Sequence, residues 1–114
     1  MIRHRVVLVP FPFDDLSGAK VRPAVCLTEP IGEHRHVALA FITSRVPASP
    51  LATDLVLDPE DHDFSLTALR VPSTLQLHRM LTVTTSLVLR ELGQLPPRMQ
   101  TEVDLRLRLL FGLD

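Results

Sequence analysis

The sequence predicts a mainly β protein, built as a small and strongly bent antiparallel barrel with one helix at its C-terminal end. Short runs rich in apolar and β-branched residues follow one another, and turn-forming residues separate them. Only the last segment has the apolar spacing of an amphipathic helix. Because consecutive short strands with tight turns pair with their neighbours, they favour an antiparallel barrel.

The predicted strands are short and evenly distributed. They cover residues 5–11, 22–28, 36–43, 53–58 and 71–83. Pro10 and Pro12 confine the end of the first strand to an edge or a corner, because proline cannot donate a ladder hydrogen bond. The run 36–43 is apolar on both faces in places, so we expect it at the centre of the sheet. Two segments are less distinct: 59–68 favours a short helical turn, and 86–95 fits either a last strand or a short helix.

The C-terminal helix is the most distinct element. Pro96 and Pro97 suit its entry, and Gly112 suits its C-cap. One apolar face is predicted from four residues at helical spacing: Met99, Val103, Leu107 and Leu110. Further apolar residues exceed what one core face needs: Leu105, Leu109, Phe111 and Leu113. This excess suggests contact with a second subunit.

Length and composition fit one soluble domain covering residues 1–114. The 114 residues are 46% hydrophobic and 22% charged, which suffices for a core without metal or disulfide. The net charge of −1 means that any nucleic-acid contact needs a local basic patch. The single cysteine, Cys26, reads as a small core residue and agrees with a reducing compartment. Without a membrane-length apolar run or a signal cleavage pattern, we expect a cytoplasmic protein with no membrane contact.

The sequence lacks the common motifs of cofactor and metal chemistry. It has no glycine-rich phosphate loop, no paired cysteines or histidines at metal spacing and no Gly-x-Ser-x-Gly. The acidic run 58–63 lacks the glycine and ligand periodicity of a calcium loop, so it reads as a solvated acidic loop. We therefore expect no metal and no cofactor.

The ends of two predicted strands hold the most informative polar residues. Arg22 stands just before Pro23, where the long loop becomes the second strand, and Thr43, Ser44 and Arg45 stand where the third strand leaves the core. If these two strands pair as a meander, antiparallel geometry brings Arg22 and Thr43 to the same edge. A guanidinium, two hydroxyls and the Lys20 loop would then converge on one anion.

Three segments together resemble the MazF/PemK toxin family of toxin–antitoxin systems. They are VVLVPFPFDDLSGAKVRPAVCLT, VALAFITSR and LRVPSTLQLHRMLTV, with LGQL before a terminal helix. The most specific order is strand, Phe-Pro-Phe, Asp-x-Ser-Gly, basic residue, Arg-Pro and apolar strand. The resemblance extends over nearly the whole chain. It implies an SH3-like barrel of the CcdB/MazF type that works as a homodimer with a cognate antitoxin.

The resemblance also implies an activity and its residues. Most family members are metal-independent endoribonucleases that cut single-stranded RNA at short sequences and leave 2′,3′-cyclic phosphate and 5′-hydroxyl ends. The key arginine of the family falls on Arg22 and the key threonine on Thr43. A fixed guanidinium stabilises the charge that grows on the phosphate oxygens, and a threonine hydroxyl donates to them. Ser44 is expected to assist at the same phosphate.

Other residues are expected to contact the RNA. The loop before Arg22 borders the RNA groove in the family, which points to Ser17, Gly18 and Lys20. Phe13, like Phe11, could stack on an unpaired base, although corner packing is an equal reading.

The sequence departs from the family in two places. Where some members carry a catalytic arginine and aspartate, this chain has Gln76 and His78. Gln76 is expected at the RNA, and His78 has the right intrinsic pKa for proton transfer, although a surface or interface histidine is an alternative. In place of the usual glycine and acidic residue before the first strand stand His4 and Arg5, which could alter the dimer edge or extend a basic patch.

Two other functions remain open on the same fold. One is a gyrase-poisoning toxin like CcdB, although such toxins use a terminal Trp-Gly-Ile-like tail and this chain has no tryptophan. The other is a nuclease-dead binding domain, which the Gln76 and His78 departure makes conceivable. Cleavage of naked RNA separates the nuclease from the binding domain, and topoisomerase inhibition identifies the gyrase poison.

Overall fold

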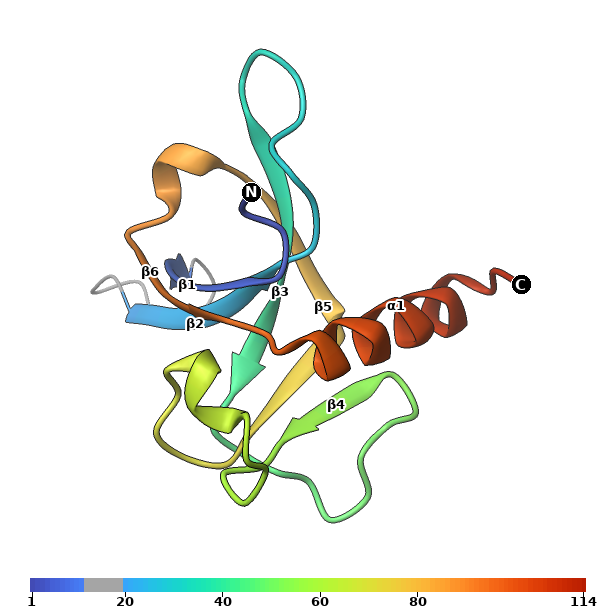
Figure 1. The fold of residues 1–114 in the computed structure, drawn as a ribbon. Coiled ribbons are helices and arrows are strands. Elements are labelled where there is room, and N and C mark those ends of the chain that lie inside the picture. Colours follow the sequence, from blue (N-terminus) through green and yellow to red (C-terminus); the bar gives the residue numbers. More distant parts are fainter. Residues whose placement is uncertain (12–19) are drawn as a thin grey trace.

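Within the described residues, six antiparallel strands form one sheet, and a single long helix follows them (Figure 1). The computed structural model of the protein describes residues 1–11 and 20–114. The strands are β1 (Arg5–Phe11), β2 (Lys20–Cys26), β3 (His36–Thr43), β4 (Asp54–Leu57), β5 (Ser73–Thr84) and β6 (Arg90–Gln94). Two short 3₁₀ helices, η1 (Phe64–Thr67) and η2 (Thr85–Leu87), precede and follow β5, and the helix α1 spans Pro97–Phe111.

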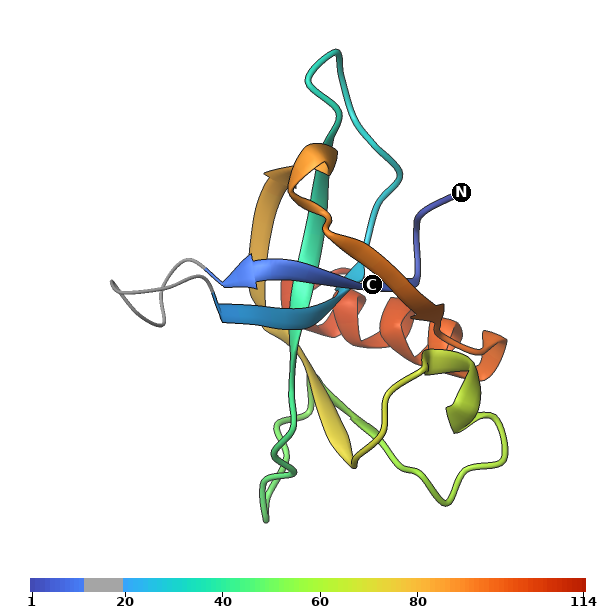
Figure 2. The ribbon, with the colours of Figure 1, turned by 90° about the vertical axis from the view of Figure 1, so that its left-hand side faces the viewer.

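The sheet has the order β4-β5-β3-β2-β1-β6 and curls into a half-barrel (Figure 2). The predicted mainly β fold with a C-terminal helix is thereby confirmed. The apolar strand β3 lies inside the sheet between β5 and β2, as its two-sided apolar pattern predicts. The ambiguous segment 86–95 forms the edge strand β6 after the turn η2, and the acidic segment contains η1.

The pairing of β3 with β5 contains an irregularity that shapes one end of the sheet. Ala40 pairs with Met80 and Ile42 pairs with Leu75, so the stretch from Gln76 to Arg79 has only one residue of β3 opposite it. Extra residues in one strand bend it and re-aim its side chains. We call this stretch of β5, residues 76–79, the β5 bulge.

The helix α1 packs on the sheet through the predicted apolar face. Met99 and Val103 are fully buried, and Leu107 and Leu110 pack against the same core. Pro97 opens the helix, and Gly112 ends it in a left-handed conformation at φ +66°. The predicted excess is also visible, because a second set of apolar side chains is exposed: Leu105, Leu109, Phe111 and Leu113. None of the helices in the described residues is long and apolar enough to cross a membrane.

The edge strand β6 contacts η1 at Gly93. A Cβ atom at this position would lie 2.7 Å from the carbonyl carbon of Thr67 and 2.8 Å from its oxygen. The position therefore requires glycine for the close approach of two backbones. Nearby, Arg98 of α1 donates hydrogen bonds to Asp63 and Asp61, at 2.9 and 3.2 Å. The acidic loop expected to be merely solvated is thus tied to the start of α1.

His4 lies inside the protein and does not extend an exposed basic patch. Its residue surface is 9% exposed, its φ is +71°, and its backbone N–H donates to the carbonyl of Cys26 at 2.7 Å. Burial, helped by the charge of Arg3, lowers the pKa of the His4 imidazole, and the nearby carboxylate of Asp104 only partly opposes this. The suggested basic patch is therefore wrong for His4.

Candidate functional site

A groove of about 780 Å³ opens at the end of β3 where that strand leaves the sheet. The strand β2 contributes Arg22 and Pro23, and β3 with its following loop contributes the segment from Phe41 to Pro47. The remaining wall comes from the segment before β5 and from β5 itself: Leu69, Arg70, Val71, Ser73, Gln76 and Arg79. Four of the residues expected at the site therefore line one groove: Arg22, Thr43, Ser44 and Gln76.

Arg22 and Thr43 reach the groove through the pairing of β2 with β3. The ladder pairs Ala24 with Phe41 in antiparallel register. Extending that register by two residues places Arg22 opposite Thr43. Both residues belong to their strands, and both line the groove. The predicted meeting of these two strand ends is thereby confirmed as a matter of position.

The hydroxyl of Thr43 has a defined orientation. Its Oγ1 accepts a hydrogen bond of 3.3 Å from the backbone N–H of Arg45. The carbonyl of Arg45 in turn accepts a 2.8 Å hydrogen bond from the hydroxyl of the buried Thr74 on β5. A hydroxyl that accepts one hydrogen bond can still donate its own proton, so Thr43 can act as a donor to a ligand in the groove.

The groove is strongly cationic, although the whole chain has a net charge of −1. Four arginines line it: Arg22, Arg45, Arg70 and Arg79. The described residues that line it include no aspartate and no glutamate. Such a concentration of one charge in a concave surface attracts anions and concentrates their field.

Arg70 and Arg79 are site residues that the sequence analysis missed. Arg70 lies in the segment between η1 and β5, and only the fold brings this segment to the end of β3. Arg79 lies in the β5 bulge, where the two-residue alternation of a regular strand does not indicate which face a side chain takes. Eleven of the twelve basic residues in the sequence are arginines, but this skew marks no position.

The structure gives His78 a different neighbour. His78 is not among the residues that line the groove, although Gln76 and Arg79 on either side of it are. Its Nδ1 atom lies 4.0 Å from Oδ1 of Asp54, whose side chain is 3% exposed. Asp54 is held from the other side, because its Oδ2 accepts from the backbone N–H of Leu51 at 2.9 Å. His78 therefore does not line the groove, and its catalytic role stays a prediction.

The remaining expected RNA contacts lie at or beyond the start of β2. Lys20 is the first residue of β2 and is exposed, but it is not part of the groove lining. Phe13, Ser17 and Gly18 lie outside the described residues, and their roles stay predictions. Cys26 is buried, as predicted, and burial raises the pKa of its thiol to about 11.

Among residues 1–11 and 20–114, no three histidine, cysteine, aspartate or glutamate side chains form a group that could hold a metal ion. The chemistry that the described groove itself offers is anion binding. It combines guanidinium groups with hydroxyls and an amide, a set suited to phosphate oxygens.

The chain belongs to the family of PemK-like, MazF-like toxins of type II toxin–antitoxin systems. The family model matches residues 2–111, nearly the whole chain. The resemblance seen in the sequence is thereby confirmed. No curated protein sequence matches the chain.

Solved structures share the fold at low sequence identity. The Mycobacterium tuberculosis toxin MazF-mt6 is 21% identical, with a TM-score of 0.73 over 96% of this chain and 98% of that one. A MazE–MazF structure from Deinococcus radiodurans is 18% identical, with a TM-score of 0.74 over 100% and 97%. An endoribonuclease in complex with its cognate antitoxin, from a mycobacterial species, is 17% identical, with a TM-score of 0.68 over 100% and 97%. At these identities, the likeness concerns the fold.

Proposed function

We propose that the protein is the toxin of a toxin–antitoxin pair and acts as a sequence-specific, metal-independent endoribonuclease on single-stranded RNA. One observation carries this proposal. Arg22 and Thr43, from two neighbouring strands, line a groove that holds four arginines and, among its described residues, no carboxylate. A groove of this charge at the open end of a half-barrel suits a flexible polyanion better than a neutral ligand.

The proposed reaction is an attack by a ribose 2′-hydroxyl on the adjacent phosphorus. The new bond joins the 2′ oxygen to phosphorus and the bond from phosphorus to the 5′ oxygen breaks, which leaves a 2′,3′-cyclic phosphate and a 5′-hydroxyl. Negative charge grows on the non-bridging oxygens during the attack. Arg22 stabilises that charge with its planar donor fork, and the Thr43 hydroxyl donates to the same oxygens. Ser44, next along the groove, supplies a further hydroxyl.

The groove supplies charge stabilisation more readily than proton transfer. Its described lining contains no histidine and no carboxylate, and arginine stays protonated throughout the physiological range. Water is therefore assigned to take the proton of the 2′-hydroxyl and to supply the proton that the departing 5′ oxygen gains. On this assignment His78 is dispensable for the chemistry.

The RNA, an antitoxin and a second subunit are the proposed partners. Antitoxin binding is supported by the cognate antitoxin in the mycobacterial complex. A homodimer is supported by the apolar side chains exposed on α1, such as Leu105 and Leu109, which one subunit leaves uncovered. Base recognition is assigned to Gln76 in the groove and to the segment with Phe13, Ser17, Gly18 and Lys20 ahead of Arg22.

Incubation of the purified protein with a long mixed-sequence single-stranded RNA in EDTA tests the proposal. The ends of the products are then sequenced, and their phosphates are identified chemically. We expect discrete cuts at one short sequence with cyclic-phosphate and 5′-hydroxyl ends.

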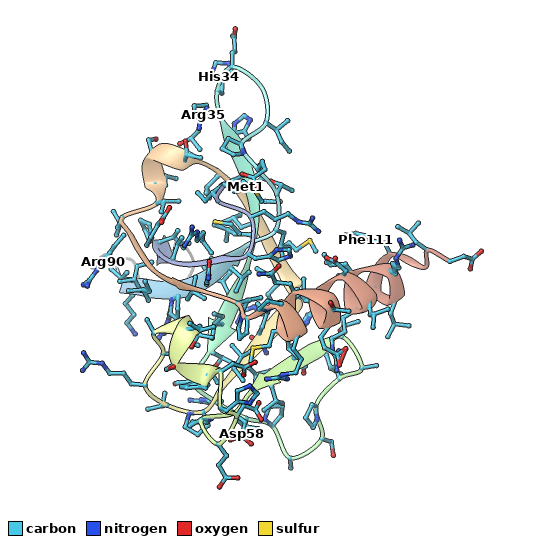
Figure 3. The ribbon with its side chains drawn as sticks, in the orientation of Figure 1. Met1, His34, Arg35, Asp58, Arg90 and Phe111 are labelled. Carbon is cyan, nitrogen blue, oxygen red and sulfur yellow. The ribbon has the colours of Figure 1, made fainter. Side chains whose placement is uncertain are left out.

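Two arginine variants make the test specific. Arg22→Gln should abolish the cuts, and Arg35→Gln should leave them unchanged, because Arg35 lies at the tip of the β2–β3 hairpin (Figure 3). Thr43 of the groove lies at the other end of β3 from this tip. Folded wild-type protein that leaves diverse RNAs intact would refute the nuclease.

A further inference from the structure

The groove has more guanidinium groups than one phosphate requires. We propose that Arg45 and Arg70 form a second anion subsite, which holds a phosphate of the same RNA strand next to the phosphate at Arg22 and Thr43. This inference rests on the proposed function and extends it from one bound phosphate to two. It assigns the subsite to two residues that come from different loops, one after β3 and one before β5.

The side chains of Arg45 and Arg70 differ from most other arginines of the described chain in their partners. Neither guanidinium has a hydrogen bond or an ion pair to any residue within 1–11 and 20–114. Elsewhere, guanidinium groups are held by carboxylates: Arg3 by Asp104 at 2.9 Å, Arg98 by Asp63 at 2.9 Å and Arg106 by Glu102 at 2.8 Å. Arg45 and Arg70 lack such a partner among the described residues, as do Arg5, Arg35 and Arg90, but only Arg45 and Arg70 of these five line the groove.

The backbone of Arg45 is fixed on both sides. Its N–H donates to Thr43 and its carbonyl accepts from Thr74, so its Cα has a set position relative to the first subsite. Two residues of chain span at most about 7 Å, and Arg45 follows Thr43 by two residues. A long side chain from this anchored position reaches a phosphate adjacent to the one that Thr43 contacts.

The charge of the groove also favours a second phosphate. Each phosphodiester carries a single negative charge, and a phosphate at Arg22 and Thr43 leaves Arg45 and Arg70 without a counter-charge among the described residues that line the groove. These two guanidinium groups then depend on salt anions. A second phosphate replaces those salt anions, and their release strengthens binding. This predicts a measurable dependence of affinity on salt concentration.

Binding of a non-cleavable RNA at several salt concentrations measures how many phosphates the groove neutralises. The probe is a single-stranded RNA that contains the cut sequence, with a 2′-deoxy sugar at the cleaved position. For single strands, each neutralised phosphate contributes about 0.7 to the slope of log affinity against log salt. We expect the Arg45→Gln, Arg70→Gln double variant, which loses the second phosphate, to lower that slope by about 0.7, and Arg70→Gln alone to lower it by no more than that. Arg35→Gln, outside the groove, should keep the wild-type slope.

Neutral phosphate analogues test whether the second phosphate is a neighbour of the first. Methylphosphonates are placed one at a time at the linkages on either side of the cut. For the wild-type protein, one of these positions should raise the KM for cleavage about tenfold without lowering kcat. In the double variant the same analogue should have no further effect, because the partner arginines are gone. As a control for folding, each variant should have the same melting temperature as the wild-type protein.

The possible failures are distinguishable. If the wild-type protein cuts RNA but the double variant keeps the salt slope and the analogue sensitivity, the second subsite is refuted and the nuclease stands. If the wild-type protein neither cuts RNA nor binds the probe, the proposed function fails, and the subsite fails with it.

Discussion

The backbone N–H of Arg45 donates a 3.3 Å hydrogen bond to the hydroxyl oxygen of Thr43. This bond ties the end of β3 to the backbone of the loop that carries Arg45, a second residue of the groove lining. The same hydroxyl still has its own proton, which on the proposed function it donates to a phosphate oxygen.

Removal of this hydroxyl should impair cleavage much more than folding. We expect Thr43→Val to lower kcat for RNA cleavage by about 10²-fold, as for the loss of one donor to a developing oxyanion. Thr43→Ser keeps a hydroxyl and should retain activity within about tenfold of the wild type. Single-turnover cleavage rates measure both. Equal activity of the valine and serine variants would contradict a role for the hydroxyl.

The pH profile of the cleavage rate should contain no inflection caused by a histidine. Because the described groove lining contains no histidine or carboxylate, log kcat should rise steadily with pH and should not level off near 6.5. His78→Gln should follow the wild-type profile, since His78 lies beside Asp54 and outside the groove. Rates measured from pH 5.5 to 8.5 decide the matter. An inflection in the wild-type profile that His78→Gln removes would contradict this and support His78 as the base.

Stability should fall as the pH falls through the range in which free histidine protonates. Burial holds the pKa of His4 below its ordinary value of 6.5, so between about pH 7 and pH 5 the unfolded chain binds more protons than the folded one. The free energy of unfolding therefore decreases from pH 7 to pH 5. Denaturant midpoints should show this decrease in the wild type.

Two histidine variants test whether His4 is the source of this pH dependence. His4→Asn should flatten the profile, and asparagine tolerates the positive φ of this position. His34→Asn, at an exposed position in the β2–β3 hairpin, should keep the wild-type profile. A flat wild-type profile would show that His4 does not experience the buried environment described above.

Replacement of Gly93 by even the smallest side chain should destabilise the protein. A Cβ there meets the backbone of η1, which cannot move away as a flexible side chain could. We expect Gly93→Ala to lower the free energy of unfolding by about 1–3 kcal/mol. Gln94→Ala, at an exposed position on the same strand, should change it by no more than about 0.5 kcal/mol. Thermal or denaturant unfolding measures both variants.

The parts of the site that depend on regular pairing could be predicted from the sequence. Arg22 and Thr43 stand at the ends of two consecutive apolar strands, so antiparallel pairing alone brings them together. The helix α1 could also be predicted, because the spacing of its apolar residues and its capping residues are local signals. In each case, neighbouring residues determine the feature.

The parts that depend on irregular backbone or distant contacts could not be predicted. The position of Arg79 follows from the β5 bulge, which no local pattern marks. The inward position of His4 requires a left-handed backbone conformation and the carbonyl of Cys26. The bond between Arg98 and Asp63 joins residues from different parts of the chain. Such features appear only once the whole fold is assembled.

The β5 bulge places a core residue between two groove residues of one strand. On the β3 side regular pairing resumes at Leu75 and at Met80, whereas on the β4 side Gln76 pairs with Asp54. Within the bulge Leu77 is fully buried in the core, and Gln76 and Arg79 line the groove. On the proposed function, a library randomised at Gln76 and Arg79 that keeps Leu77 would vary the groove surface while leaving the core side chain in place.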